Sequence, residues 1–117
     1  MTAVASVPGR QNLKADFPRV LCVDDEPHVL EGLRDSLRRS FDVSVADSGG
    51  AGLALLEKDP DGYAVVVSDM RMPGMSGAAF LSQAKRVAPN AVRVLLTGHA
   101  DVEAAISAVN DGQLFAS

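Results

Sequence analysis

Four residues with oxygen-bearing side chains each follow a short apolar run of the sequence: Asp24, Asp25, Asp69 and Thr97. Carboxylates that lie close together repel one another unless a cation or a proton intervenes. A cluster of hard oxygen ligands without nitrogen or sulfur favours Mg²⁺, which commonly shares its coordination sphere with phosphate oxygens. If the fold brings these residues together, the sequence predicts phosphoryl chemistry with Mg²⁺ rather than storage of a bare metal ion.

The segments that carry these residues alternate between strand and helix patterns from residue 19 onward. Strands are predicted at residues 20–23, 43–46, 64–67 and 92–96, with the beginning of a fifth at 114–117. Helices are predicted at residues 27–40 and 52–58, from Ser76 as N-cap to Pro89, and from Asp101 to Gly112. This alternation is typical of an α/β protein with a parallel sheet and helices on both faces. The alternating pattern of residues 43–46 indicates a strand at the sheet edge.

The carboxyl ends of parallel strands lie at one edge of such a sheet, because the crossover connections are right-handed. Ligands bind at this edge where the strand order reverses. If the first and third strands are neighbours, Asp24, Asp25 and Asp69 converge there. Taken singly, Asp25 could cap the helix that begins at Pro27, and Asp69 could begin a turn. Three carboxylates and a hydroxyl at three strand ends together favour a functional site.

Length, composition and charge indicate one ordinary globular domain. The chain has 117 residues, of which 47% are hydrophobic and 22% are charged, and this balance excludes disorder over the whole chain. Residues 1–18 read as a flexible tail and residues 19–117 as the folded domain. The formal net charge of −4 disfavours a general nucleic-acid surface. We therefore expect no direct nucleic-acid partner.

Membrane and secretory signals are also missing from the sequence. No apolar run approaches the roughly 20 residues that cross a bilayer. The first residues lack the basic and apolar blocks of a secretory signal, and the single cysteine, Cys22, cannot form an intrachain disulfide. We therefore expect no membrane partner and a cytoplasmic location, with Cys22 as a small buried hydrophobic residue.

Three blocks of the sequence resemble the signature blocks of response-regulator receiver domains. They are Val-Leu-Cys-Val-Asp-Asp-Glu at 20–26, Val-Ser-Asp-Met-Arg-Met-Pro-Gly-Met-Ser-Gly at 67–77, and Leu-Leu-Thr-Gly at 95–98. They occur in the family's order and at suitable spacing, and the second block is the most specific. The resemblance implies a doubly wound parallel sheet of the flavodoxin-like order 2-1-3-4-5.

The resemblance also implies a role for each candidate residue. Asp69 would be the phosphoacceptor, which takes a phosphoryl group from a sensor histidine kinase or a phosphotransfer protein. Asp25 and Asp69 would ligate Mg²⁺ directly together with the backbone carbonyl of Arg71, and Asp24 would act through a bound water. Thr97 would hydrogen-bond a phosphoryl oxygen and move inward. The domain would switch contacts with an output domain or a downstream protein and would not be an enzyme beyond its own phosphotransfer and slow dephosphorylation.

The sequence departs from the family pattern at its last residues. Receivers carry a Lys-Pro pair at the end of the fifth strand and a fifth helix after it, and this sequence stops at Ser117 before both. We expect the fifth strand to be incomplete and the fifth helix absent, either because this is a piece of a longer chain or because the chain is truncated. A poorly paired sheet edge invites association, so we expect a homodimer through residues 92–117.

Two other functions stay open from the sequence. A truncated or degenerate receiver would act as a phosphorylation-independent dimerisation or protein-binding module; the missing lysine favours this alternative and the intact aspartates disfavour it. A phosphatase with an aspartate nucleophile would normally show Asp-x-Asp after the first strand, whereas Asp24 and Asp25 are adjacent here. The receiver function therefore ranks first and the phosphatase last.

Overall fold

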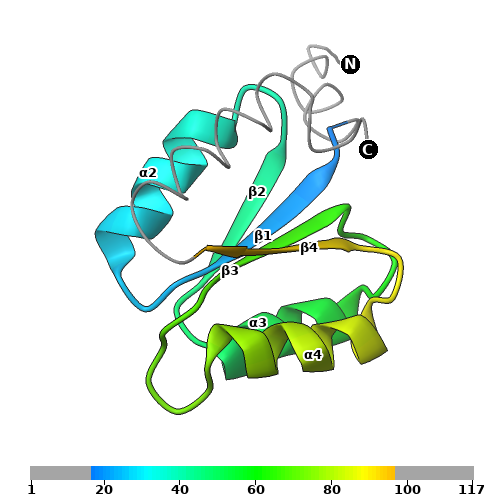
Figure 1. Cartoon of the computed structure of the whole chain (residues 1–117). Coiled ribbons are helices and arrows are strands. Elements are labelled where there is room, and N and C mark those ends of the chain that lie inside the picture. Colours follow the sequence, from blue (N-terminus) through cyan, green and yellow to red (C-terminus); the bar gives the residue numbers. More distant parts are fainter. Residues whose placement is uncertain (1–16, 97–117) are drawn as a thin grey trace.

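The computed structural model of the protein describes residues 17–96, in which four parallel strands form one sheet of order β2-β1-β3-β4 (Figure 1). The strands are β1 (Arg19–Val23), β2 (Asp42–Ala46), β3 (Val65–Asp69) and β4 (Val92–Leu96). The helices within the same range are α2 (Pro27–Leu37), α3 (Gly49–Lys58) and α4 (Gly77–Val87). The predicted α/β class, the flavodoxin-like order of the first four strands and the edge position of β2 are confirmed. The predicted fifth strand and the helix after Asp101 lie outside the described residues.

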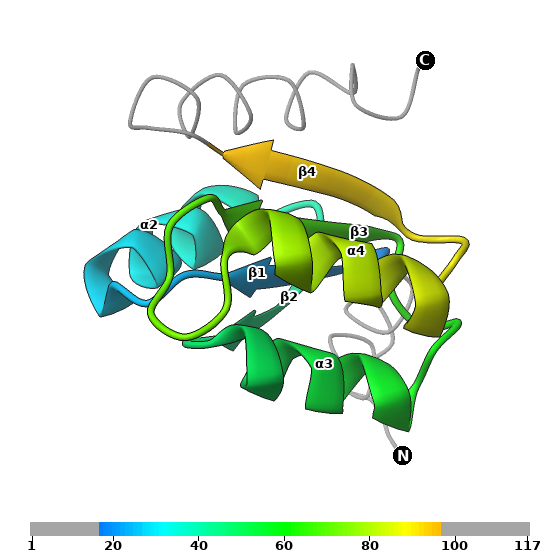
Figure 2. The same ribbon diagram turned by 60° about the horizontal axis from the view of Figure 1, so that its bottom comes forward.

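The sheet has helices on both faces: α2 covers one, and α3 and α4 cover the other (Figures 1 and 2). Alternate residues of β1 supply the two cores. Val20 and Cys22 pack with Leu33 of α2, whereas Leu21 packs with Phe80 of α4. Each fully buried side chain of this size contributes roughly 1.5–3 kcal/mol. Burial on both faces explains why β1 reads as a continuous apolar run.

Helix α2 ends at Leu37, three residues before the end predicted from the sequence. The backbone N–H of Phe41 donates to the carbonyl of Leu37 at 2.9 Å, and the Phe41 side chain is buried beside the helix. The chain therefore leaves the helix early, because burying Phe41 turns the segment toward β2.

Helix α3 begins at Gly49, three residues before the predicted start. The Ser48 side chain caps it, since its Oγ accepts a hydrogen bond from the N–H of Ala51 at 3.1 Å. A Cβ at Gly52 would lie 2.9 Å from the ring of Phe80. Glycine at this position allows α3 to pack closely against α4. The helix therefore begins within the glycine-rich segment rather than after it.

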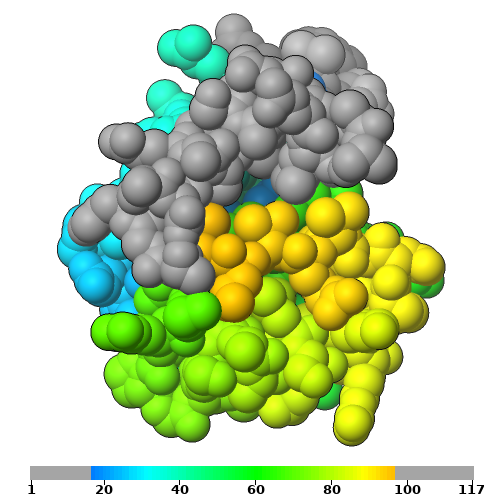
Figure 3. Space-filling model, in the orientation of Figure 1, coloured from blue at the N-terminus to red at the C-terminus, as the bar shows by residue number. Residues whose placement is uncertain are grey.

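The predictions for α4 and β4 agree with the structure. Ser76 caps α4 through a 3.1 Å hydrogen bond from the N–H of Ala79, and β4 has the predicted bounds. Part of β4 reaches the molecular surface above α4 (orange in Figure 3), and Val92 is 41% exposed. Residues 97–117 of the predicted dimer side lie outside the described range, so the homodimer stays a prediction.

The described range begins within the segment that the sequence predicts to be a tail. The predicted tail of residues 1–18 overlaps it at Phe17 and Pro18, and the carbonyl of Pro18 accepts a 2.9 Å hydrogen bond from the N–H of Asp42.

Across residues 17–96, the helices are all too short or too polar to traverse a lipid bilayer.

Candidate metal centre

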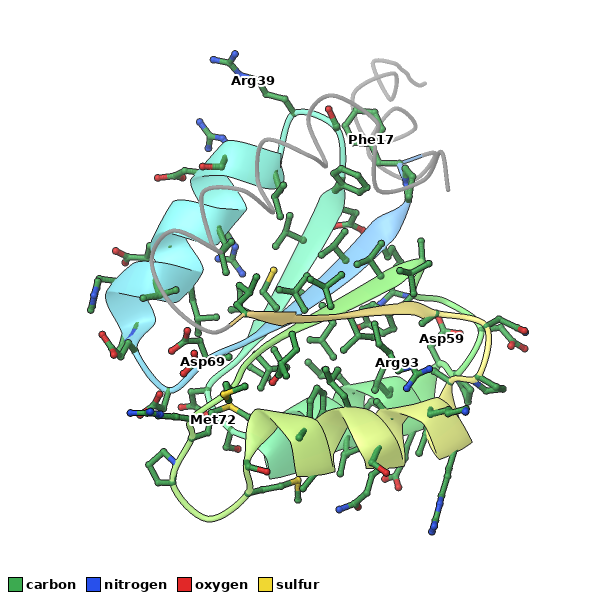
Figure 4. All side chains as sticks on the ribbon, in the orientation of Figure 1. Phe17, Arg39, Asp59, Asp69, Met72 and Arg93 are labelled. Atoms are coloured by element: carbon green, nitrogen blue, oxygen red, sulfur yellow. The ribbon has the colours of Figure 1, made fainter. Side chains whose placement is uncertain are left out.

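Three carboxylates converge at the carboxyl end of the sheet. One oxygen from each of Asp24, Asp25 and Asp69 lies within 4.8 Å of the others. Strands β1 and β3 are neighbours, so the residues that follow them reach the same edge. Figure 4 shows Asp69 where the loops after β1 and β3 come together. The convergence predicted from the sequence is confirmed.

Asp24 is the buried member of this cluster, with 6% of its surface exposed. Its Oδ1 accepts a 2.9 Å hydrogen bond from the backbone N–H of Glu26, and its own N–H donates to the carbonyl of Ala46 at 3.1 Å. Burial raises the pKa of Asp24 above its ordinary value, the hydrogen bond from Glu26 opposes this rise, and the nearby charge of Asp69 adds to it. The carboxylate of Asp24 is therefore fixed by a hydrogen bond and partly removed from solvent.

Asp25 is exposed and Asp69 is half-buried, so both are accessible from solvent. The N-cap residue of α2 is Glu26, and no side chain caps this helix. The alternative that Asp25 serves as a helix cap is therefore wrong. Asp69 is the last residue of β3. The next residue, Met70, still pairs with β4, because its N–H donates a 2.9 Å hydrogen bond to the carbonyl of Leu96. The carboxylate of Asp69 thus stands at the end of a strand that is still paired.

The loop after Asp69 is closed by a backbone hydrogen bond between its two ends. The N–H of Gly77 donates to the carbonyl of Met70 at 2.9 Å. A Cβ at residue 77 would overlap the carbonyl oxygen of Asp69, so this position needs glycine for close approach. Gly74 has a φ of 82°, the left-handed conformation that glycine adopts without strain. These two glycines let the loop turn back to α4 without moving Asp69.

Ser68 is a site residue that the sequence analysis did not single out. It is fully buried, and its Oγ donates a 2.9 Å hydrogen bond to the backbone carbonyl of Asp69. A polar residue within an otherwise apolar strand, directly before the candidate nucleophile, was the available signal. Ser68 steadies the main chain of Asp69 and leaves its carboxylate free.

Two predicted site residues are not placed against the cluster by the described structure. Arg71 is exposed in the loop after β3, and the role of its carbonyl as a metal ligand stays a prediction. Thr97 lies outside the described residues. Leu96, the last described residue, is in register with Asp69 on the adjacent strand.

The donor set fits a small hard cation. Mg²⁺ binds oxygen at about 2.1 Å, so opposite ligands of one ion lie about 4.2 Å apart. The three carboxylate oxygens lie within 4.8 Å of one another, a spacing that one cation can bridge together with bound water. The cluster contains neither nitrogen nor sulfur, which disfavours zinc. Asp24, Asp25 and Asp69 are therefore suited to hold Mg²⁺ directly or through water.

Comparison with known families agrees with this geometry. The sequence model of the response regulator receiver domain matches residues 20–114. The chain belongs to this family. The match includes Asp24, Asp25, Asp69 and the loop after β3, so the candidate site of this receiver domain lies within the matched residues.

Curated relatives of this receiver domain include transcriptional regulators. Hydrogenase transcriptional regulatory protein HoxA of Cupriavidus necator is 35% identical over 96 residues, which are 82% of this chain and 20% of that protein. DNA-binding transcriptional regulator NtrC of Escherichia coli is 37% identical over 95 residues, which are 80% of this chain and 20% of that protein. The chain thus spans about a fifth of the length of these relatives.

Solved structures show the same fold. A response regulator receiver domain protein from Clostridium thermocellum is 32% identical with a TM-score of 0.67, over 82% of this chain and 77% of that one. The structure of an adenylate cyclase from Rhodopirellula baltica is 40% identical with a TM-score of 0.66, over 85% of this chain and 73% of that one.

Proposed function

We propose that this receiver domain accepts a phosphoryl group on Asp69 with Mg²⁺ as cofactor. The donor is a phosphohistidine of a sensor histidine kinase or of a phosphotransfer protein. The observation that carries the proposal is the half-exposed carboxylate of Asp69, whose oxygen lies within 4.8 Å of those of Asp24 and Asp25. Three carboxylates at this distance repel one another, and a bound cation would remove that repulsion.

The chemical step uses one oxygen of Asp69. This oxygen forms a bond to phosphorus while the bond from phosphorus to the histidine nitrogen breaks, and the nitrogen keeps the electron pair. The product is an acyl phosphate. Bound Mg²⁺ offsets negative charge on the transferring group. Asp25 and Asp69 would hold the ion, and Asp24, oriented by the N–H of Glu26, would act through a water.

The surrounding chain keeps the nucleophile in place. Ser68 and Gly77 both contact the backbone carbonyl oxygen of Asp69, one by a hydrogen bond and one by close approach. A fixed main chain beside an accessible carboxylate supports in-line attack, because phosphoryl transfer depends on positioning and charge. Thr97 and the carbonyl of Arg71 would complete the site.

The phosphorylated domain would switch contacts with an output domain or a downstream protein. HoxA and NtrC are named as transcriptional regulators, and the chain matches about a fifth of each. An output domain would lie in the part that this chain does not cover. The net charge of −4 supports the expectation that the receiver itself does not bind nucleic acid. We propose a cytoplasmic location and no turnover of an external substrate.

The test is phosphorylation by a small donor. The full chain, incubated with Mg²⁺ and acetyl phosphate, should gain one phosphoryl group by intact mass, and Asp69→Asn should gain none. Asp35→Asn removes an exposed acid on α2 and should behave as the wild type. Label on Asp69→Asn equal to that on the wild type would overturn the proposal. An unlabelled wild-type chain that still binds its kinase would instead favour the phosphorylation-independent binding module.

A further inference from the structure

A groove of about 590 Å³ lies along the outer edge of the sheet, where β2 is the last strand. Its lining includes Leu30 of α2, Val45 of β2 and Ala54 of α3. These two helices cover opposite faces of the sheet (Figures 1 and 2). The groove is therefore an open strand edge with a helix on either side of it.

The edge strand directs backbone groups into this groove. Among residues 17–96, β2 pairs with β1 alone. The carbonyl of Ala46 accepts a hydrogen bond from the N–H of Asp24, so Ala46 faces β1. Backbone groups alternate in direction along a strand, so the N–H and C=O of Val43 and Val45 face away from β1. Such an edge can pair with another strand.

Two opposite charges line the groove at its two ends. Asp47 follows the carboxyl end of β2, whereas Lys58 is the last residue of α3. Because β2 and β3 run in the same direction, α3 between them runs back toward the amino end of the sheet. Its ten residues span about 15 Å. Both charges are exposed, and neither forms an ion pair within the described part of the chain.

We propose that a second copy of this chain docks at this edge, with the two β2 strands antiparallel about a twofold axis at Ser44. This arrangement sets Val43 of one copy opposite Val45 of the other, and the backbone groups of both residues face outward. It also brings Asp47 of each copy toward Lys58 of the other. The edge is therefore complementary to itself in hydrogen bonding and in charge, as a twofold interface requires.

The side chains beside the edge suit this arrangement. A twofold axis perpendicular to the sheet sets the two α3 helices on one face, and α3 exposes Gly50, Ala51 and Ala54. Small side chains allow two helices to pack at a short distance. On the other face, Val43 and Val45 pack against the core under α2. The valine pairs between the two copies would extend this core across the interface.

The proposed interface leaves the phosphoacceptor site open. Strand β1 separates β2 from β3, which carries Asp69. Variants of the interface should therefore gain the same phosphoryl label from acetyl phosphate as the wild type. Loss of the dimer and loss of phosphorylation are thus separate results, and equal labelling also shows that a variant has kept its fold.

Sedimentation equilibrium of the full chain tests the interface. The wild type should dimerise as its concentration rises, and Ala54→Arg should weaken the dimer about tenfold or more, because a long charged side chain would stand between the two α3 helices. Val92→Arg adds the same charge on β4, where Val92 is 41% exposed, and should dimerise as the wild type does. A wild type that stays monomeric up to about 1 mM would overturn the proposal. Dimerisation lost in Val92→Arg and kept in Ala54→Arg would also overturn it, because the second copy would then bind at β4.

Charge reversal tests the contacts at the two ends of the groove. Asp47→Lys and Lys58→Asp should each weaken the dimer, because each sets like charges together in both symmetric contacts. The double variant restores opposite charges and should regain most of the wild-type affinity. A double variant that dimerises no better than the single variants would contradict the proposed pairing.

Disulfide formation tests the position of the axis. Residue 44 would face the same residue of the second copy as a non-hydrogen-bonded pair, with the Cα atoms about 4.5 Å apart, and a disulfide can span this distance. Ser44→Cys should therefore give a disulfide-linked dimer under mild oxidation, in much higher yield than Ser82→Cys on the exposed side of α4. Burial raises the pKa of the natural Cys22 to about 12, so it does not compete. Equal yields from the two variants would overturn the proposal.

Discussion

At the carboxyl end of the sheet, three carboxylate oxygens lie within 4.8 Å of one another. At the amino end, by contrast, two opposite charges form an ion pair. The guanidinium of Arg19 lies 2.6 Å from the carboxylate of Asp59, donates a 3.0 Å hydrogen bond to the hydroxyl of Tyr63, and lies 4.2 Å from the centre of its ring. Figure 4 shows Asp69 and Asp59 at opposite ends of the sheet.

The difference separates stability from function within one fold. Paired charges and an aromatic contact at the amino end hold the start of β1 to the turn before β3. Unpaired like charges at the carboxyl end oppose folding, and a cation that binds the folded state removes this cost. Substitutions of the paired residues at the amino end should therefore change stability alone, whereas substitutions of the carboxylates at the carboxyl end should change ligand binding, sometimes with a gain in stability.

The largest expected effect is at Gly77. In Gly77→Ala the new Cβ would overlap the carbonyl of Asp69 and crowd Leu95, and moving the backbone should cost about 3 kcal/mol of unfolding free energy. Gly32→Ala is the matched control, because its Cβ meets no atom within 4 Å; it should stabilise α2 by about 0.5–1 kcal/mol. Urea unfolding measures both. Similar stabilities of the two variants would show that the loop is not closed against Asp69.

The next effect concerns Mg²⁺ binding. Asp25→Ala should weaken Mg²⁺ by about tenfold or more, because the affinity of an oxygen site depends on its ligand charge. Asp59→Ala removes one acid at the amino end and should leave Mg²⁺ affinity unchanged. Isothermal titration with Mg²⁺ compares the two. An equal loss in both variants would mean that Mg²⁺ responds to net charge rather than to this cluster.

A smaller effect with the opposite sign is expected at Asp24. Because the folded state raises the pKa of Asp24, its charge destabilises the metal-free protein at neutral pH, and this cost disappears as the pH falls below the ordinary range of an aspartate. Asp24→Asn should therefore melt a few degrees higher at pH 7 without metal, and the gain should vanish near pH 3. Thermal melts at both pH values, with Asp35→Asn as control, measure this. A lower melting temperature at pH 7 would contradict the sign.

The smallest effect is expected at the amino end. Arg19→Met removes the ion pair and the contact with Tyr63 and should cost about 1 kcal/mol, because the pair is half-exposed and screened by solvent. Lys58→Met, at the neighbouring end of α3, should change stability little. Chemical unfolding measures the stability, and Mg²⁺ affinity should stay as in the wild type. A change in Mg²⁺ affinity on Arg19→Met would show that the two ends are coupled.

Much of the fold was predictable because its signals are local. Apolar runs marked the strands, and Ser76 before a helical pattern marked the start of α4, since a serine cap acts on the next few residues alone. The end of α2 was not predictable in this way. It depends on Phe41, whose burial beside the helix is a contact between elements rather than a property of the local sequence.

The candidate site divides in the same manner. The sequence by itself determined that Asp24, Asp25 and Asp69 follow apolar strands, because hydrophobic patterning sets where a buried strand must stop. The tertiary structure alone decided that β1 and β3 lie side by side, that Asp24 is buried while adjacent Asp25 is exposed, and that Ser68 and Gly77 meet at the carbonyl of Asp69. The pairing of β1 with β3 joins segments more than forty residues apart in the chain, and no local pattern carries that information.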